Sequence, residues 1–434
     1  MLAAVAAAGL AAAAALVATS GSGKRGARAS STPSTAAAPT SSVAPGPTSG
    51  ASTSSTRGAS PNRPVPAPRG TRRELAVGVV EISAVQSPDA RVAAEQVRRI
   101  RRAGFDSIVL QAVWSPGART LSGRQLVSLR NGVDASLRAG LRVFLVVAID
   151  RARDAPVTAA ARTDYAAFAA AAARRFPRVR DVVVGNEPNL NTFWLPQFGP
   201  DGTDAAAHDY EAVLAAAYDA LKHVSPAIRV IGGALAPRGS DNPLLERPTH
   251  SPTQFVLDLG AAYRASGRTR PLMDGFAMHP YLRLSRIPPT ASHAASKTIT
   301  LADYPKLTAT LARAFGGTAQ RGATLPIYYT EFGVQTTTPR LKLALYLDLG
   351  SPAARDAVSA QTQGRYYVEA LRLAACQPTV RGFFIFHSVD EPDLRGWQSG
   401  LYYADGTPKP SLPVVRRAIR ELRASGFACG RRAP

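Results

Sequence analysis

The hydrophobic pattern divides the sequence into three parts. Residues 1–18 are almost all apolar, and residues 19–72 are rich in Ser, Thr, Ala, Pro and Gly with almost no large hydrophobic side chains. From there to Phe427, short apolar runs alternate with amphipathic stretches. This pattern predicts a signal peptide or membrane anchor over residues 1–18, a disordered linker over 19–72 and one folded domain over 73–434.

Eight short runs within the folded domain are rich in Val, Ile, Leu and Phe. They are nearly continuous in apolar residues and do not alternate, which is typical of parallel strands buried on both faces. The eight runs are Leu75–Ala84, Ser107–Trp114, Arg142–Ile149, Asp181–Val184, Arg229–Ala234, Gly275–Met278, Pro326–Thr330 and Gly382–Phe386.

Each run is followed by a stretch with apolar positions three and four residues apart, the spacing of an amphipathic helix. These stretches are Asp89–Ala103, Arg124–Ala139, Thr163–Arg175, Ala205–His223, Thr253–Ser266, Leu301–Phe315, Thr362–Ala375 and Pro413–Ser425. A strand followed by a helix, eight times over, predicts a (β/α)8 TIM barrel of the α/β class. The competing fold is a doubly wound open sheet. It would more often carry a Gly-rich loop after the first strand, where this chain has Glu81-Ile82-Ser83.

The apolar leader and the polar linker bear on localisation. No basic residue precedes the apolar run, whereas Lys24, Arg25 and Arg28 follow it, which is the reverse of a typical export signal. A polar Ser/Thr/Pro linker behind an apolar leader nevertheless has few uses in the cytoplasm. We therefore expect an extracytoplasmic protein, either secreted or membrane-anchored.

The net charge of +22 comes almost entirely from arginine. A nucleic-acid-binding function is not expected, because the chain has no basic run interleaved with aromatic residues and no zinc-ligand spacing. The surplus of arginine is compatible with adhesion to an anionic cell surface. The sequence gives no indication of the oligomeric state.

The chain has two cysteines, Cys376 and Cys429, which excludes a disulfide-scaffold protein and a cysteine-based zinc site. The sequence allows these two to pair but does not require it. If they pair, the loop-entropy model gives a stabilisation of roughly 4 kcal/mol. No cluster with metal-ligand spacing is present, so neither a metal nor an organic cofactor is expected.

In a TIM barrel the chemistry lies at the carboxyl ends of the strands. In this sequence polar and aromatic residues gather where the apolar runs stop: Trp114, Asp150, Asn186-Glu187, His279-Pro280-Tyr281, Glu331 and His387. Two of them are carboxylates on the fourth and seventh strands, on opposite sides of the barrel mouth. Cleavage of a glycosidic bond needs such a pair, one to protonate the leaving oxygen and one to meet the positive anomeric centre.

The stretch from Val183 to Leu190, Val-Val-Gly-Asn-Glu-Pro-Asn-Leu, followed by Phe193-Trp194, resembles the fourth-strand motif of clan A glycoside hydrolases. It is most similar to family 39, the β-xylosidases and α-L-iduronidases, with some features of family 5 cellulases. The resemblance implies that Glu187 is the general acid/base and that Asn186 contacts the sugar 2-hydroxyl.

Further motifs extend this resemblance over nearly the whole domain. Ile-Tyr-Tyr-Thr-Glu-Phe-Gly at 327–333 resembles the seventh-strand motif and implies that Glu331 is the nucleophile. His279-Pro280-Tyr281 is similar to the clan's His-x-Tyr, which implies that Tyr281 orients the nucleophile and that His279 contacts the substrate or the surrounding network. The segment Gly400–Pro410 is similar to the segment that follows strand eight in many of these enzymes.

Two positions depart from the family pattern. Gly185 stands where family 39 often has Trp, and His387 stands where much of the clan places a Trp beneath the scissile sugar. Either Trp397 supplies that surface from the following loop or the subsite differs. Trp114 and Trp194 are further candidates for stacking on a sugar, since an aromatic face suits the C–H surface of a pyranose.

The sequence thus predicts a retaining glycoside hydrolase that cleaves a polysaccharide or oligosaccharide by double displacement. The alternative is a barrel that binds glycans or the cell wall but has lost turnover. A third possibility is a surface adhesin for anionic polymers, whose affinity would fall steeply with salt.

Overall fold

The computed structural model describes residues 75–348 and 356–429. The leader and linker predicted over residues 1–72 lie outside these residues. Among the described helices, none is long and apolar enough to cross a lipid bilayer.

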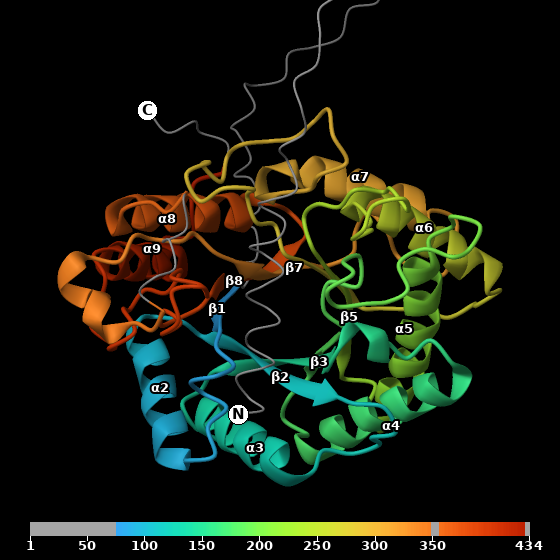
Figure 1. Cartoon of the computed structure of the whole chain (residues 1–434), viewed down its shortest axis with the longest axis horizontal. Helices are drawn as coiled ribbons and strands as arrows, with labels where there is room; N and C mark the ends of the chain where they lie inside the picture. Colours follow the sequence, from blue (N-terminus) through green and yellow to red (C-terminus); the bar gives the residue numbers. More distant parts are fainter. Residues whose placement is uncertain (1–74, 349–355, 430–434) are drawn as a thin grey trace, which may run out of the picture. The chain divides into compact units, whose positions relative to one another are not determined.

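The described residues contain eight strands that form one closed parallel barrel. They are β1 (Ala76–Val80), β2 (Ser107–Trp114), β3 (Arg142–Ile149), β4 (Asp181–Val184), β5 (Arg229–Leu235), β6 (Gly275–Met278), β7 (Ile327–Phe332) and β8 (Val380–Phe386). Each strand pairs with its successor, and β8 returns to pair with β1, Val77 opposite Phe383 (Figure 1). The predicted (β/α)8 fold is confirmed.

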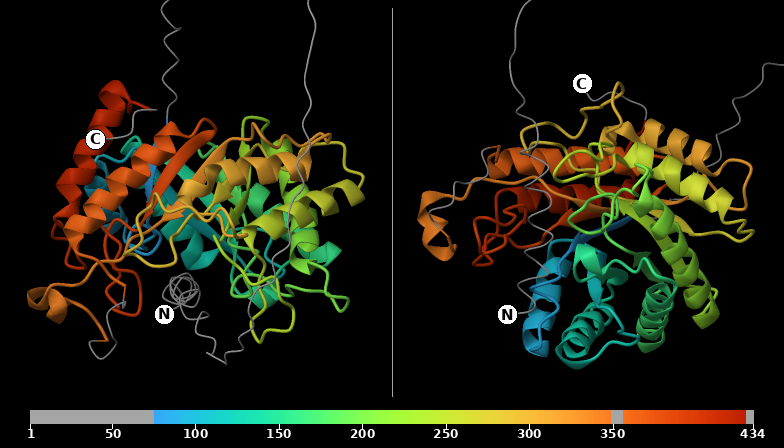
Figure 2. Two further views of the ribbon diagram at one scale, coloured as in Figure 1. Left: turned by 90° about the horizontal axis from the view of Figure 1, so that it is seen from above. Right: turned by 45° about the vertical axis from the view of Figure 1, so that its right-hand side comes forward.

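Helices surround this barrel (Figures 1 and 2). They are α2 (Ala90–Arg102), α3 (Gly123–Arg138), α4 (Ala159–Arg175), α5 (Ala205–Val224), α6 (Pro252–Ala265), α7 (Tyr304–Phe315), α8 (Ala360–Cys376) and α9 (Ser411–Ser425). The side chains of Asp89, Thr158, Asp204, Ser251 and Ser359 each accept a hydrogen bond from a first-turn N–H and so cap α2, α4, α5, α6 and α8.

The strands are apolar throughout because both of their faces are buried. One cluster takes at least one residue from every strand, including Phe144, Tyr328 and Phe384, and fills the barrel. A larger cluster takes the alternate strand residues together with the inner faces of the helices. Alternation along each strand therefore divides its side chains between the two cores.

Several predicted boundaries differ from the structure, and two of the differences have local explanations. The first strand ends at Val80, because the Glu81 carboxylate accepts hydrogen bonds from the backbone N–H groups of Ser388 and Val389 at the end of β8. The helix predicted over 301–315 begins with a 3-10 turn, Leu301–Asp303, which a capping box formed with Thr300 holds.

A charged cluster ties three strands together at their amino ends, opposite the face where chemistry is expected. Asp181 at the start of β4 is buried and binds both Arg142 of β3 and Arg229 of β5 through paired hydrogen bonds of 2.6–2.9 Å. Two parallel N–H···O bonds to one carboxylate are a strong and geometrically specific contact. We therefore assign this cluster a role in the stability of the fold.

A disulfide joins Cys376, at the end of α8, to Cys429, beyond α9, across a sequence separation of 53 residues. The pairing that the sequence left open is therefore present. It fastens the end of the domain to a helix that precedes the last strand.

Candidate active site

Two carboxylates lie at the carboxyl end of the barrel. Glu187 follows β4 after a two-residue turn, and its backbone N–H donates to the carbonyl of Ala234 on β5. Glu331 lies within β7. Both side chains are buried, with 7% and 8% of the residue surface exposed. The turn thus fixes Glu187 against the neighbouring strand, so its carboxylate does not depend on a free loop for its position.

The turn before Glu187 explains why this chain lacks the tryptophan that family 39 often has there. Gly185 has a backbone φ of +78°, and a Cβ at this position would lie 3.1 Å from the ring of Tyr210. That ring occupies the space, because the Tyr210 hydroxyl donates to the carbonyl of Val184 at 2.7 Å and accepts from the N–H of Gly233 at 2.8 Å. Glycine is the residue that fits both the backbone angle and the space.

His279 lies between the two carboxylates. Its Nδ1 is 2.9 Å from Oε1 of Glu187 and 3.5 Å from Oε2 of Glu331. One ligand atom from each of the three residues lies within 4.8 Å of the other two, so an oxygen of Glu187 lies no more than 4.8 Å from an oxygen of Glu331. Residues far apart in the sequence therefore converge on one small space.

Tyr281 completes this group, which we call the carboxylate cluster: Glu187, His279, Tyr281 and Glu331. The hydroxyl of Tyr281 donates to Oε2 of Glu331 at 3.0 Å. The ring of Trp397 lies 5.2 Å from the Tyr281 ring, centroid to centroid, and retains some exposure at 7%. The structure therefore brings Trp397 to the cluster from the loop after β8.

The groups of the carboxylate cluster alter one another's affinity for protons. Burial raises the pKa of Glu331 above its ordinary value and the charge of Glu187 adds to this, whereas His279 and the Tyr281 hydroxyl oppose it. Burial lowers the pKa of His279, but the charges of Glu331 and Glu187 more than offset burial, so this pKa is raised. The ionisation of Glu331 and that of His279 therefore depend on each other.

Asn186, the residue expected to contact a sugar hydroxyl, is half-buried. Its Nδ2 is buried and has no hydrogen-bond partner among the described residues. Leaving a buried amide donor without a partner costs free energy. The Nδ2 of Asn186, next to Glu187 in the chain, is therefore a donor that a ligand can use.

The predicted sugar-stacking role is wrong for Trp114 and Trp194. Both are at most 1% exposed and belong to the core between barrel and helices. Trp114 packs edge-on against Tyr165 and donates its Nε1–H to the carbonyl of Ala118, while Trp194 packs edge-on against Tyr210. A ring with no exposed face cannot stack on a sugar.

His387 takes the place of the clan's tryptophan at the end of β8. Its Nδ1 lies 3.0 Å from the carbonyl of Val80 and therefore carries a proton. Its Nε2 is buried without a hydrogen-bond partner among the described residues, 3.6 Å from Glu391. The charge of His387 lowers the pKa of Glu331. The sequence indicated His387 only by its position at a strand end, and it gave no sign of Glu391.

The carboxylate cluster also satisfies the spacing of a cation site, since Glu187, His279 and Glu331 offer ligand atoms within 4.8 Å of one another. His279 Nδ1 lies at hydrogen-bonding distance from Glu187, so these two groups already have each other as partners. The sequence spacing of these residues carries no metal signature.

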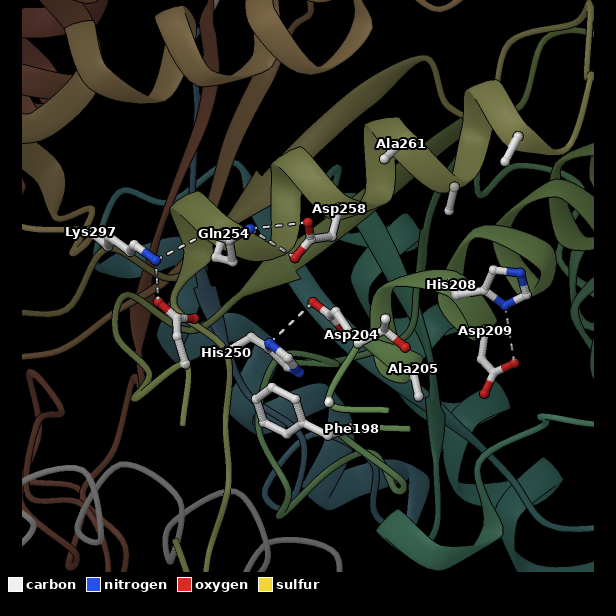
Figure 3. A pocket seen from close by; sticks show the side chains of 15 residues that line it. Phe198, Asp204, Ala205, His208, Asp209, His250, Gln254, Asp258, Ala261 and Lys297 are labelled. Atoms are coloured by element: carbon white, nitrogen blue, oxygen red, sulfur yellow. Dashed lines mark hydrogen bonds and ion pairs between the residues drawn. The ribbon is translucent and has the colours of Figure 1, made fainter. Parts of the chain in front are cut away.

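A separate pocket of about 820 Å3 lies between α6 and the loops that follow β4 and β5 (Figure 3). No residue of the carboxylate cluster lines it. Asp204 lies 3.2 Å from Nδ1 of His250, and Lys297 lies 3.1 Å from Asp241. Two of its acidic side chains thus have a histidine or lysine neighbour.

No protein-family model matches this sequence, and no curated protein matches it. Solved structures do resemble it. A family 39 glycoside hydrolase from Bacteroides cellulosilyticus WH2 has a TM-score of 0.57 and 20% identity, covering 81% of this chain and 65% of that one. A family 39 β-xylosidase from Caulobacter crescentus has a TM-score of 0.53 and 18% identity, covering 83% and 74%.

A GH5_18 enzyme from Streptomyces cattleya, solved with GlcNAc, has a TM-score of 0.53 and 17% identity, covering 83% of both chains. The matched part of the chain spans 65% of the length of the Bacteroides enzyme. The chain has the (β/α)8 barrel that these glycoside hydrolases of families 39 and 5 share, and the resemblance to clan A is confirmed in the fold.

Proposed function

We propose that this chain is a retaining glycosidase that hydrolyses the O-glycosidic bonds of a polysaccharide or oligosaccharide. The observation that carries the proposal is the approach of Glu187 and Glu331 to within 4.8 Å across the mouth of the barrel. Retaining enzymes hold their two carboxyl groups about 5–5.5 Å apart, whereas inverting enzymes need about 6.5–9.5 Å to admit a water. The separation here supports double displacement.

In this mechanism Glu331 attacks the anomeric carbon as a carboxylate while Glu187 donates its proton to the departing oxygen. A covalent glycosyl-enzyme forms on Glu331. Glu187 then takes a proton from water, and the water attacks the anomeric carbon and releases Glu331.

Hydrogen bonding supports this division of roles. The Tyr281 hydroxyl donates to Glu331, and such a bond stabilises a carboxylate, the form that a nucleophile needs. His279 Nδ1 lies closer to Glu187 than to Glu331, and it can exchange a proton with the acid/base. The strand positions of the two glutamates agree with the clan motifs.

We also propose that the protein acts outside the cytoplasm. The disulfide between Cys376 and Cys429 supports this, because such bonds persist in oxidising compartments and are rare in the cytosol. Fractionation of cells that express the full chain tests it, and recovery of the protein with both thiols free in the cytosol would overturn it.

A panel of aryl glycosides tests the catalytic proposal. We expect Glu331→Ala to abolish release of the aryl alcohol. Glu187→Ala should retain activity on substrates with good leaving groups and be rescued by azide, because such substrates need no acid. The first product, followed by proton NMR, should have the anomeric configuration of the substrate.

Glu95→Ala is the matched control, since Glu95 lies on the exposed face of α2 with 59% of its side chain accessible. Activity of wild-type level in both active-site variants on every substrate would overturn the assignment. Binding of glycosides without release by the wild-type protein would instead favour the non-catalytic glycan-binding alternative.

A further inference from the structure

Arg238 lies three residues beyond β5, at the carboxyl end of the barrel where the carboxylate cluster is found. Its one hydrogen bond among the described residues runs from Nη1 to the carbonyl oxygen of Tyr281, at 3.4 Å. Its Nε is buried and has no partner there. No ion pair links Arg238 to any carboxylate in residues 75–348 or 356–429.

This arrangement is unlike that of the structural arginines of the same chain. Arg142 and Arg229 share Asp181, and Arg268 binds Asp219 with two hydrogen bonds. Those partners raise the pKa of each guanidinium. Arg238 is half-buried, and its Nε is buried without a partner among the described residues. An unsatisfied buried donor is costly, so we look for its partner outside the chain.

The surrounding charges strengthen this argument. Burial lowers the pKa of Arg238 to about 10, and the positive charge of Arg283 lowers it as well. Arg283 is exposed, two residues beyond Tyr281, and likewise forms no ion pair with a described carboxylate. Arg283 therefore adds a second positive charge near Arg238, and neither guanidinium has a carboxylate at ion-pair distance among the described residues.

The proximity of Glu187 indicates which part of the substrate Arg238 faces. The backbone N–H of Glu187 donates to the carbonyl of Ala234, four residues before Arg238, and the charge of Glu187 opposes the fall in the pKa of Arg238. Under the proposed function Glu187 protonates the departing oxygen, so groups beside it face the part of the substrate that leaves. Arg238 therefore belongs to the leaving-group side and not to the sugar that becomes bonded to Glu331.

We propose that Arg238, with Arg283, binds a carboxylate or sulfate group on the leaving-group side of the substrate, which makes the substrate an acidic oligosaccharide or polysaccharide. This inference rests on the proposed function. A guanidinium presents its N–H groups as a planar fork that matches both anions. The net charge of +22 would also attract a polyanionic chain to the protein.

The test compares aryl glycosides of one sugar, the sugar that the panel above identifies, with three leaving groups: umbelliferone, its 3-carboxylate and its 3-sulfonate. We expect the wild-type kcat/KM to favour the anionic leaving groups by about 10- to 100-fold over the neutral one, the range expected for a charge-assisted contact. Arg238→Met should reduce that preference to near one. Differences in leaving-group chemistry cancel, because the comparison is between proteins on the same substrates.

Arg247→Met is the matched control, since Arg247 is exposed in the same loop after β5, and its preference should equal that of the wild type. A preference for the carboxylate alone or the sulfonate alone would identify which anion the site takes. Equal kcat/KM for charged and neutral leaving groups in the wild type, or a preference retained in Arg238→Met, would overturn the inference.

Two further measurements separate this inference from its alternatives. Arg238→Met should have a Tm no lower than that of the wild type, because it removes a half-buried charge that has no ion-pair partner among the described residues. A clear fall in Tm would mean a structural role and overturn the inference. The free coumarins are also titrated by fluorescence. If no glycoside is hydrolysed but the carboxylated coumarin binds through Arg238, the hydrolase assignment fails while the anion site stands.

Discussion

Removal of one hydroxyl tests the electrostatics of the carboxylate cluster. Tyr281→Phe deletes the O–H that donates to Oε2 of Glu331 at 3.0 Å and keeps the ring that packs against Trp397. This hydrogen bond favours the ionised carboxylate, so its loss raises the pKa of Glu331, which burial already raises. The nucleophile must be ionised, and the acid limb of kcat/KM therefore moves to higher pH.

The size of the shift follows from the strength of the bond. A hydrogen bond to a charged group contributes about 1.5–3 kcal/mol, and about 1.4 kcal/mol corresponds to one pKa unit. The acid limb of kcat/KM should thus move upward by roughly 1 to 2 pH units. The limb reports the free enzyme, and because His279 and Glu331 influence each other's ionisation it does not belong to Glu331 alone.

The assay is the pH dependence of kcat/KM on one aryl glycoside, measured for wild type, Tyr281→Phe and Tyr329→Phe. Tyr329 is the matched control, because it lies on β7 two residues before Glu331 but its hydroxyl donates to Gln377 on the outer side of the barrel. Tyr329→Phe should leave the acid limb in place. An unchanged or lowered limb in Tyr281→Phe would refute the reasoning, whatever the fall in rate.

Three other predictions concern stability and metal dependence. Asp181→Ala should lower the free energy of unfolding, measured by urea titration, by about 3 kcal/mol. This value is at the low end for loss of one partner of a buried ion pair, because Arg142 and Arg229 are partly exposed to solvent. A loss too small to measure would contradict this prediction. Replacing both Cys376 and Cys429 by Ser should cost about 4 kcal/mol by the loop-entropy model while kcat is kept; unchanged stability would mean that the bond contributes nothing. Dialysis against EDTA should leave kcat/KM unchanged, and activity that is lost and then restored by added zinc would show that the cluster works through a cation.

The fold could be predicted well from the sequence, because strands that are buried on both faces consist of unbroken runs of apolar residues. The bounds of β2, β3, β4 and β6 agree with the prediction to the residue. The same property explains the error at Trp114. An unbroken apolar run does not distinguish inward from outward positions, and Trp114 falls on the outward register with Leu110 and Ala112.

The parts of the site on strand ends could be predicted, and the parts that depend on loop conformation could not. Glu187, His279 and Glu331 are close to strands, so the barrel geometry brings them together. Arg238 and Glu391 lie in loops whose paths depend on contacts with distant segments. Nothing in the residues that flank them indicates that they would reach the barrel mouth.

The pairing of β1 with β8 has a consequence for synthesis of the protein. A ribosome delivers the first strand about 300 residues before the last, and until β8 emerges the backbone N–H and C=O groups along one side of β1 and of β7 have no partner. A nascent chain that stops before Val380 therefore exposes two apolar strand edges whose backbone groups can pair with other chains. Truncated products of this gene should aggregate or be degraded, and the barrel should become protease-resistant only once its final strand has left the ribosomal tunnel.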